Sequence, residues 1–369
     1  MINPMYEKLA NVVVNYSLEV KKGHRVAITG PAFAKELFQA LYAETIKSGA
    51  HPLAIPQIEG LNELLFQLAS EEQLGYVDDA IKHIMSNFNS YIQIRADYNT
   101  QKLTTIDPKK IAKNQGSPQY KEIMKILMER SASEELKWII VPFPCQAYAQ
   151  EAKMDIFSYS EFVNEALLLD KENPLEEWKK IQIKQENIVE KLNQADKIRV
   201  IGADTELVLS VKGRIWKNCC GKNNLPDGEV YTGPVEDSVN GNIRFTYPGI
   251  YQGREIENIY LEFKDGRVIK AIADKGQELL DEILKIENAD RLGEFAIGTN
   301  YGITQFTKNM LFDEKMGGTI HCALGLGMAE TGSKNVSAIH WDILKDMKVP
   351  GSKIFVGEQI IYEEGKWKI

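Results

Sequence analysis

The chain has 369 residues, of which 44% are hydrophobic and 26% are charged, as in ordinary globular proteins. Its formal net charge of −8 and its pI of about 5.4 argue against a nucleic-acid-binding protein, which usually carries a basic face. A chain of this length exceeds what one ordinary hydrophobic core accommodates. We therefore expect two domains, residues 1–190 and residues 191–369.

Cysteine usage and hydropathy both indicate a cytoplasmic protein. The four cysteines include the adjacent pair Cys219 and Cys220 but no C-x-x-C motif, so we expect reduced thiols. Residues 1–20 space their apolar side chains like an amphipathic helix and do not resemble a signal peptide. No segment approaches the roughly 20 consecutive apolar residues of a transmembrane helix. We expect neither a membrane nor a nucleic acid as a partner.

The first half of the sequence alternates short apolar runs with segments of helical periodicity, which predicts an α/β domain with a mostly parallel sheet. A strand, a helix and a second strand at this spacing form a βαβ unit, whose two strands run parallel. The expected strands lie within residues 23–30, 50–55, 90–95 and 137–142, and the expected helices within residues 34–48, 61–74 and 120–131.

A turn at Gly30-Pro31-Ala32 follows the first expected strand and precedes a helix, where phosphate groups bind in many nucleotide-binding proteins. The turn lacks the G-x-G-x-x-G spacing, so we interpret it as an ordinary strand-to-helix connection. A nucleotide-using α/β enzyme is nevertheless one alternative function for the chain, and it predicts measurable affinity for a nucleotide.

The second half is predicted to be an α+β domain that is rich in β-strands and carries the metal site. An amphipathic helix within residues 174–194 connects it to the first domain. The expected strands include residues 197–202, 207–211, 242–247, 256–263 and 268–273, and one helix is expected at residues 277–286.

Residues 338–343 alternate like a β-strand, which places His340 and Asp342 on one face and Trp341 on the other. Two ligands that are two residues apart on a rigid strand fix the geometry of a metal site well. The alternative is a buried His–Asp pair that has only a structural role.

His321 lies on another expected strand, flanked by glycines that allow a ligand to approach the backbone closely. Thr319, His321 and Ala323 share one face of this strand. Cys322 points to the other face, so we leave it out of the ligand set. Taken alone, a histidine in the setting of His321 is more often a core residue whose hydrogen bonds are satisfied.

Two glutamates complete the candidate set. Glu294 follows Arg291-Leu-Gly, where a helix or turn passes into a strand, and Glu229 follows the turn-rich run Asn223-Asn-Leu-Pro-Asp-Gly. Either glutamate alone would ordinarily be solvated. Together with Asp342 and the two histidines they form the imidazole and carboxylate set of many hydrolytic metal sites. Five ligands favour two divalent ions, because one tetrahedral zinc needs fewer.

Several motifs in the second half resemble the thermophilic aminopeptidase T family of metallopeptidases. They are Leu225-Pro-Asp-Gly-Glu-Val-Tyr-Thr-Gly-Pro234, Arg291-Leu-Gly-Glu294, His321-Cys-Ala-Leu-Gly325 and His340-Trp-Asp342. The runs Val20-Lys-Lys-Gly-His-Arg-Val26 and Ser48-Gly-Ala-His-Pro52 also look like the N-terminal domain of that family. The resemblance therefore covers most of the chain, and its most specific parts are the run through Glu229 and the His-x-Asp pair.

The resemblance implies that Glu229, Glu294, His321, His340 and Asp342 hold a two-metal centre, with zinc, cobalt, manganese or magnesium as candidate ions. It also implies removal of N-terminal amino acids from peptides with a free N-terminus, and a homodimer. In such a hydrolase the ions acidify a water molecule and polarise the scissile carbonyl, while a carboxylate carries the proton to the leaving amine. Glu229 or Glu294 is the candidate for this catalytic role.

One position departs from the family pattern. Seven residues after the first ligand histidine the family commonly has a tyrosine, whereas this chain has Met328. A thioether cannot donate a hydrogen bond to an oxyanion. Either Tyr231, Tyr301 or another group serves instead, or the activity and the substrate range differ. A metal-binding homologue with impaired catalysis is therefore a further alternative.

Overall fold

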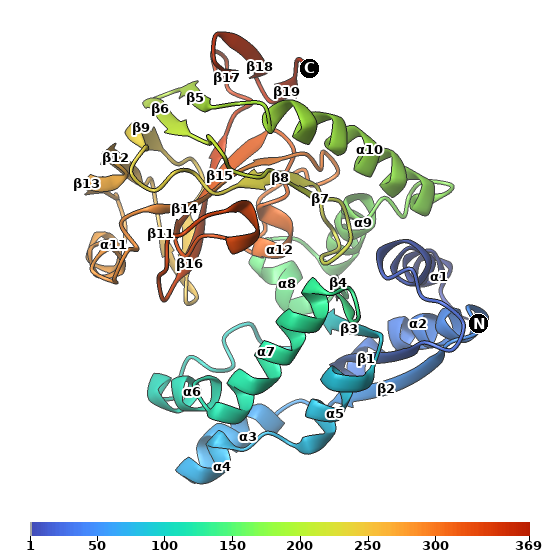
Figure 1. Cartoon of the computed structure of the whole chain (residues 1–369). Coiled ribbons are helices and arrows are strands. Elements are labelled where there is room, and N and C mark those ends of the chain that lie inside the picture. The colour runs from blue at the N-terminus through green and yellow to red at the C-terminus, as the bar shows by residue number, and fades with distance from the viewer. Residues whose placement is uncertain (1) are drawn as a thin grey trace. The chain divides into compact units, whose positions relative to one another are not determined.

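A computed structural model describes residues 2–369, so Met1 lies outside the described residues (Figure 1). Its contacts divide the chain into two compact units. The first comprises Met1–Glu177 and Gly221–Leu225, and the second comprises Trp178–Cys220 and Pro226–Ile369. The contact boundary therefore lies inside helix α10 (Pro174–Leu192), and the domain division at residue 190 stays a prediction.

The first unit is built on a parallel sheet of four strands in the order β2-β1-β3-β4. The predicted α/β fold class is confirmed. Central strand β1 is buried along nearly its whole length, which is the pattern of a strand covered on both faces. The strands are β1 (Arg25–Pro31), β2 (His51–Gln57), β3 (Ser90–Arg95) and β4 (Lys137–Pro142).

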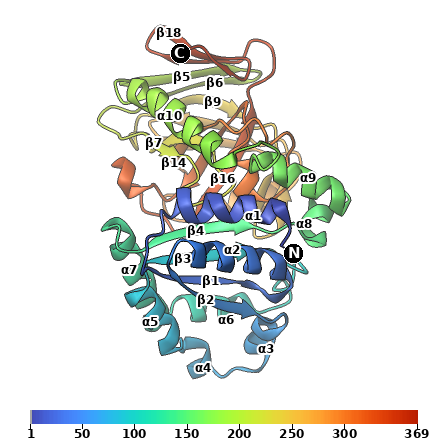
Figure 2. The same ribbon diagram turned by 90° about the vertical axis from the view of Figure 1, so that its right-hand side faces the viewer.

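Helices cover both faces of this sheet. Helices α1 and α2 lie over one face, while α5 and α7 lie over the opposite face (Figures 1 and 2). A short π-helix (Val12–Ser17) extends α1, in agreement with the amphipathic helix expected there. The helices of this unit are α1 (Pro4–Asn11), α2 (Lys35–Lys47), α3 (Leu61–Leu68), α4 (Glu71–Gly75), α5 (Asp79–Asn87), α6 (Pro108–Gln115), α7 (Pro118–Ala132), α8 (Gln146–Glu151) and α9 (Ile156–Ala166).

The single helix predicted within residues 61–74 is wrong in one respect, because the structure has two helices there. Ser70 is extended between them, and its side chain accepts a hydrogen bond from the backbone N–H of Gln73. The Gln73 side chain in turn accepts from the backbone N–H of Ser70. This capping box begins α4 and ends the regular path of α3.

The second unit contains two large sheets, in agreement with the predicted β-rich second half. One has eight strands in the order β13-β12-β9-β6-β5-β17-β18-β19, and the other has five in the order β16-β15-β14-β8-β7. The strands of the larger sheet are β5 (Lys197–Gly202), β6 (Thr205–Ser210), β9 (Asn240–Arg244), β12 (Tyr260–Lys264), β13 (Arg267–Ile272), β17 (Lys353–Val356), β18 (Gln359–Glu363) and β19 (Lys366–Trp367).

The five-stranded sheet is antiparallel throughout. Its strands are β7 (Lys217–Cys219), β8 (Glu229–Thr232), β14 (Leu292–Gly298), β15 (Thr319–Gly325) and β16 (His340–Asp346). A separate hairpin, β10 (Gly249–Tyr251) with β11 (Arg254–Ile256), and helices α11 (Gln277–Leu284) and α12 (Met310–Asp313) complete the unit. The predicted strand 256–263 is interrupted, because Asn258 adopts a left-handed conformation between β11 and β12.

The core of the second unit lies between its two large sheets. Leu207, Ile243 and Leu261 of the eight-stranded sheet belong to the same buried cluster as Phe295 and Ile343 of the five-stranded sheet. One face of the five-stranded sheet therefore packs against the eight-stranded sheet, and its other face can carry polar side chains. Within residues 2–369, no helix combines the length and apolar character that a membrane crossing requires.

Candidate metal centre

The five predicted ligand side chains lie on one face of the five-stranded sheet. Side chains alternate between the faces of a strand, and the neighbours of the five ligands belong to the core on the opposite face. Those neighbours are Val230, Phe295, Ile320, Cys322, Trp341 and Ile343, so Cys322 points away from the site, as expected. Four adjacent strands supply the five ligands: β8 carries Glu229, β14 carries Glu294, β15 carries His321, and β16 carries His340 and Asp342.

A β-bulge turns Glu294 toward the site. In a regular strand Leu292 and Glu294 would share a face, yet Leu292 lies in the core. The register between β14 and β15 shifts between these two residues, at Gly293. A Cβ atom on Gly293 would lie 2.3 Å from the carbonyl oxygen of Leu326, so only glycine fits this bulge. The bulge reverses the alternation and places the carboxylate beside the imidazole of His321.

Glu229 is held at the start of β8 by its backbone. Gly228 has a φ of +123°, and a Cβ there would lie 2.9 Å from the Cβ of Asn300. Asn300 donates to the carbonyl oxygen of Asp227 (2.8 Å), while Gln185 of α10 donates to the carbonyl oxygen of Glu229 (2.9 Å). These contacts fix the main chain from which the carboxylate projects.

The donor atoms of the five predicted ligands converge. His321 Nε2 lies 3.1 Å from Glu294 Oε1, 3.6 Å from Glu229 Oε2 and 3.8 Å from Asp342 Oδ1. His340 Nε2 lies 3.4 Å from Asp342 Oδ1 and 3.7 Å from Glu294 Oε2. The atoms form two groups, each lying within 4.8 Å: Glu229, Glu294 and His321 in one, and Glu294, His340 and Asp342 in the other. Glu294 belongs to both.

Two buried oxygen atoms at the centre of this arrangement have unused hydrogen-bonding capacity. Among residues 2–369, no group hydrogen-bonds to Glu229 Oε2 or to Asp342 Oδ1. A buried carboxylate oxygen without a partner is costly, because the carboxylate has lost its hydration. Both atoms point to the imidazole Nε2 atoms, so a cation between them would satisfy them. The residues therefore fit a divalent-metal centre.

The second ring nitrogens orient both histidines. His321 Nδ1 lies 3.1 Å from the carbonyl oxygen of Glu314, and His340 Nδ1 lies 2.7 Å from that of Leu326. A carbonyl oxygen only accepts hydrogen bonds, so each Nδ1 carries the proton and donates it. This leaves Nε2 of each ring toward the carboxylates, as in histidines whose ring orientation is fixed for metal binding.

The carboxylates strongly favour positive charge on the two imidazoles. Burial opposes that charge, but Glu294, Glu229 and Asp342 outweigh it and raise the pKa of His321 to about 9. Burial likewise opposes the charge of His340, while Asp342 and Glu294 raise its pKa to about 10. A site with this much negative charge attracts cations, whether they are protons or metal ions.

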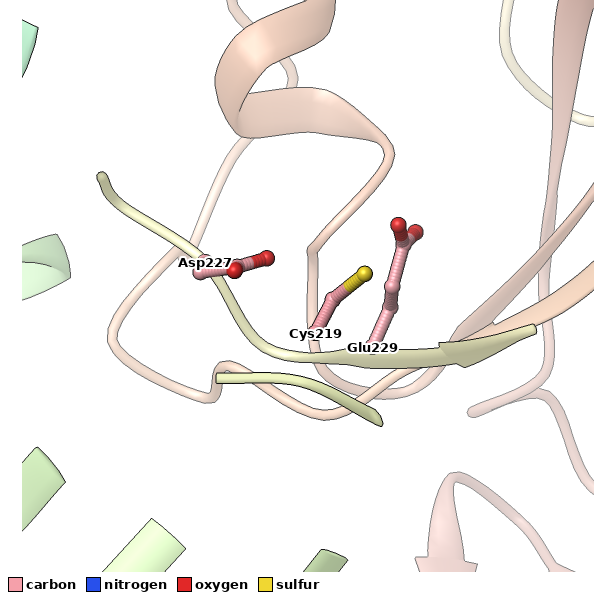
Figure 3. Close-up of side chains that lie close together, drawn as sticks. All are labelled: Cys219, Asp227 and Glu229. Atoms are coloured by element: carbon pink, nitrogen blue, oxygen red, sulfur yellow. The ribbon is translucent and has the colours of Figure 1, made fainter. Parts of the chain in front are cut away.

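A second cluster adjoins the site through Glu229. Cys219, Asp227 and Glu229 lie side by side on and next to β7 and β8, with the thiol between the two carboxylates (Figure 3). The ammonium group of Lys315 is bound here: it donates to Glu229 Oε1, lies 2.8 Å from Glu314 Oε1 and lies 3.8 Å from Asp227 Oδ1. Burial opposes the charge of Lys315, but the three carboxylates outweigh it and keep its pKa above the usual value.

Tyr231 shares the site face with Glu229, because the two are two residues apart on β8. Its hydroxyl donates to Glu330 Oε1 (3.0 Å), and burial, with Glu294 among the nearby charges, raises its pKa. Tyr301, the other tyrosine considered from the sequence, donates instead to the carbonyl oxygen of Gly365 (2.8 Å). Of the two, Tyr231 is the one that shares a strand face with a predicted ligand, Glu229.

Lys315, Asp227 and Cys219 are neighbours of the site that were not predicted from the sequence. Lys315 lies in the run Asp313-Glu-Lys-Met, which resembles solvated surface, yet its side chain is only 3% exposed. Asp227 is part of the turn motif that identified Glu229, so its position next to that glutamate was the available signal. No local pattern linked Lys315 to either residue.

A parallel α/β unit joined to a β-rich unit, with two imidazoles and three carboxylates on one sheet face, defines a metal-dependent hydrolase. Residues 3–367 match the sequence profile described as thermophilic metalloprotease (M29). The chain belongs to this family, and the resemblance inferred from its motifs is confirmed.

Similar proteins agree with this assignment. The chain is 24% identical to aminopeptidase 2 of Geobacillus stearothermophilus, over 98% of this chain and 97% of that protein. It is 26% identical to aminopeptidase T of Thermus thermophilus, over 79% of this chain and 76% of that protein. The solved structure of wild-type AmpT from Thermus thermophilus has the same fold, with a TM-score of 0.84, 22% identity and 99% of each chain covered.

Proposed function

We propose that the protein is a metal-dependent aminopeptidase that removes N-terminal amino acids from peptides with a free N-terminus, using two divalent ions. The observation that supports it most directly is the convergence of five donor side chains around two buried carboxylate oxygens that lack partners among residues 2–369. The relatives are named aminopeptidases, which supports cleavage at the N-terminal end of the peptide.

The donor atoms suggest how two ions would be held. Glu229, Glu294 and His321 would bind one ion, and Glu294, His340 and Asp342 would bind the other. Glu294 would bridge them, since Oε1 lies nearest to His321 and Oε2 lies nearest to His340. Nitrogen and carboxylate donors without sulfur suit zinc, cobalt, manganese or magnesium.

When bound, such ions lower the pKa of water toward 7 and polarise a peptide carbonyl. The protein contributes the remaining groups. Glu229 or Glu294, whichever does not bridge the ions, would accept the proton of the attacking water and transfer it to the leaving amine, as a general base and then a general acid. Tyr231, on the same sheet face, would donate its single hydroxyl proton to the oxygen that develops negative charge once that oxygen replaces Glu330 as the acceptor, a role that Met328 cannot fill.

The surface of the first unit supports a homodimer. Four leucines of helix α3 are more than a third exposed: Leu61, Leu64, Leu65 and Leu68, the last at 77%. Beside them in sequence, β2 forms an edge of the parallel sheet. Grouped exposed leucines and an open sheet edge are typical of an association surface. Sedimentation of the wild type and of Leu64→Asp would test this; a monomeric wild type would contradict it.

A cytoplasmic location is also part of the proposal. The four cysteines are free thiols in the part of the chain from residue 2 onward. Free thiols persist in reducing compartments, whereas secreted proteins commonly form disulfides. Cell fractionation would test the location, and recovery of the protein outside the cytoplasm would contradict it.

Hydrolysis of leucyl and other aminoacyl amides, with and without a chelator, tests the activity. We expect turnover that the chelator abolishes and that divalent ions restore. Activity that resists a chelator would contradict the metal mechanism. A protein that binds metal fully but hydrolyses no aminoacyl substrate would instead favour an impaired homologue. Nucleotide affinity without hydrolysis would favour the nucleotide-using alternative.

A further inference from the structure

We propose that Lys315 is a positioning residue of the metal centre: its ammonium group occupies the place of a cation beside Glu229 and restricts this glutamate to a single free oxygen. This inference rests on the proposed function, because it concerns how Glu229 is presented to a metal ion. Lys315, together with Cys219 and Asp227 beside it, would support Glu229, which is a role that the catalytic reaction itself does not require.

Burial of Lys315 is energetically costly. Its side chain is 3% exposed, and it follows helix α12 in a turn, where a lysine would ordinarily extend into water. An isolated buried ammonium group is strongly destabilising unless several acceptors compensate for its lost hydration. Glu229, Glu314 and Asp227 supply that compensation. The compensated ammonium group is thereby held in a fixed position beside Glu229.

Lys315 is surrounded by side chains that could themselves bind a metal ion. Cys219, Asp227 and Glu229 have their donor atoms within 4.8 Å of one another, a spacing that could hold a metal ion (Figure 3). A thiol with two carboxylates would divert Glu229 to a separate site that includes sulfur. With the ammonium group of Lys315 bound to Glu229 Oε1, this cluster already contains its cation.

The two carboxylate oxygens of Glu229 have different partners. Oε1 accepts from Lys315, whereas Oε2 lies 3.6 Å from His321 Nε2 and accepts from no group among residues 2–369. The two oxygens of one carboxylate therefore have different environments. Glu229 can offer one oxygen to an ion, and its plane is fixed by the lysine.

Glu314 connects this arrangement to the histidine. Its carboxylate binds Lys315, and its carbonyl oxygen accepts from His321 Nδ1. The turn after α12 thus holds Glu229 through its lysine and His321 through its backbone. Two of the three predicted ligands of the first ion, Glu229 and His321, therefore depend on the same short segment.

Metal titration of chelator-treated protein tests the proposal. Isothermal titration with Zn²⁺ would compare the wild type with Lys315→Ala and Lys315→Arg, and Lys345→Met would serve as a matched control. Lys345 is another buried lysine, 1% exposed, that donates to the carbonyl oxygens of Ala203 and Arg244 and contacts no predicted ligand. We expect Lys315→Ala to lower the binding affinity for one of the two ions by about 10- to 100-fold, the usual effect of losing a residue that supports a ligand.

A cobalt spectrum gives a signature that a purely structural role would not produce. In Lys315→Ala the vacated position allows Cys219 to bind Co²⁺, so we expect a sulfur-to-cobalt charge-transfer band that the wild type lacks. The additional change Cys219→Ser should remove the band. Lys315→Arg keeps a positive charge and hydrogen-bond donors, and should retain both the wild-type spectrum and most of the affinity.

The outcomes separate the two proposals. A wild type that binds no divalent ion contradicts the proposed function. A wild type that binds two ions, together with a folded Lys315→Ala that binds both equally tightly and shows no sulfur band, contradicts only the role of Lys315. If Lys315→Ala does not fold, Lys315→Gln takes its place. Weaker Zn²⁺ binding in Lys315→Gln but not in Lys315→Arg supports the proposal. Equal Zn²⁺ affinity in the two variants overturns it.

Discussion

Glu294 Oε1 lies 3.1 Å from His321 Nε2, across two adjacent strands whose register a β-bulge has shifted. The other oxygen of the same carboxylate faces His340, at 3.7 Å. One glutamate therefore contacts both imidazoles, and every other predicted ligand contributes to only one of the two donor groups. Glu294 is the residue on which the two halves of the site depend.

Replacement of Glu294 should therefore affect both ions. In Glu294→Ala we expect the affinity for each of the two ions to fall. Glu229→Gln should lower the affinity for only one ion, because Glu229 belongs to only one of the two donor groups that include Glu294. Isothermal titration of chelator-treated protein measures both steps. Loss of a single ion in Glu294→Ala, with the other bound at wild-type affinity, would show that the glutamate does not bridge.

Tyr231 should contribute to the rate and not to metal content. Loss of one hydrogen-bond donor to a developing oxyanion typically lowers kcat by about 10²- to 10³-fold. We expect Tyr231→Phe to show a loss of this order with full metal occupancy. Tyr301→Phe is the matched control, since its hydroxyl donates to the backbone of Gly365 and should leave the rate per folded molecule unchanged. Equal rates for Tyr231→Phe and the wild type would exclude this role.

Gly228 should be required for the position of Glu229. In Gly228→Ala the new Cβ would lie 2.9 Å from Asn300 Cβ, in addition to the cost of a positive φ. Displacement of a catalytic group by about 1 Å can lower the rate 100-fold, so we expect kcat/KM to fall by about that factor. Gly253→Ala shares the positive φ but meets no atom within 4 Å, so it should lose stability and keep its activity. If the two variants have the same kcat/KM, close packing at Gly228 does not position Glu229.

Much of the fold follows from local sequence patterns. The predicted strands at residues 90–95, 137–142 and 197–202 coincide with β3, β4 and β5, because each is an apolar run between turn residues. The helix predicted at residues 61–74 was too long, since the reciprocal hydrogen bonds of Ser70 and Gln73 are a capping signal inside an apolar pattern. Hydrophobic periodicity does not detect such a break.

The parts of the site that depend on the alternation of side chains along a strand could be predicted from the sequence. The parts that depend on tertiary contacts could not. His340 and Asp342 share a face as their spacing requires, at 3.4 Å. The orientation of Glu294 could not be derived from its own segment, because the bulge at Gly293 reverses the alternation. Lys315 was not predicted, since its partners Asp227 and Glu229 are far from it in sequence.

The buried carboxyl group of Asp313 should make stability depend on pH. Its Oδ1 accepts from the N–H and the hydroxyl of Thr307, and its side chain is fully buried. Burial, only partly offset by these bonds, raises its pKa from 3.8 to about 7. Below pH 3.8 both states are protonated. Between that value and pH 7 the unfolded chain loses the proton that the folded protein keeps, so the free energy of unfolding falls as pH rises.

Asp313→Asn removes this titration. At about 1.4 kcal/mol for each pKa unit, the wild type should lose up to about 4 kcal/mol relative to the variant between the two pH limits. Urea unfolding of both chelator-treated proteins at several pH values measures the difference. Parallel pH profiles for the two proteins would show that the carboxyl group has an ordinary pKa in the fold.

We expect Glu229, Glu294, His321, His340 and Asp342 together to hold a pair of divalent ions. Elemental analysis of purified wild type and His340→Ala, both folded and equilibrated with the same metal, tests it most directly. We predict two ions per wild-type chain and a lower content in His340→Ala. An unchanged metal content in the variant, or a folded wild type that retains no ion, would show that these five side chains do not hold the ions.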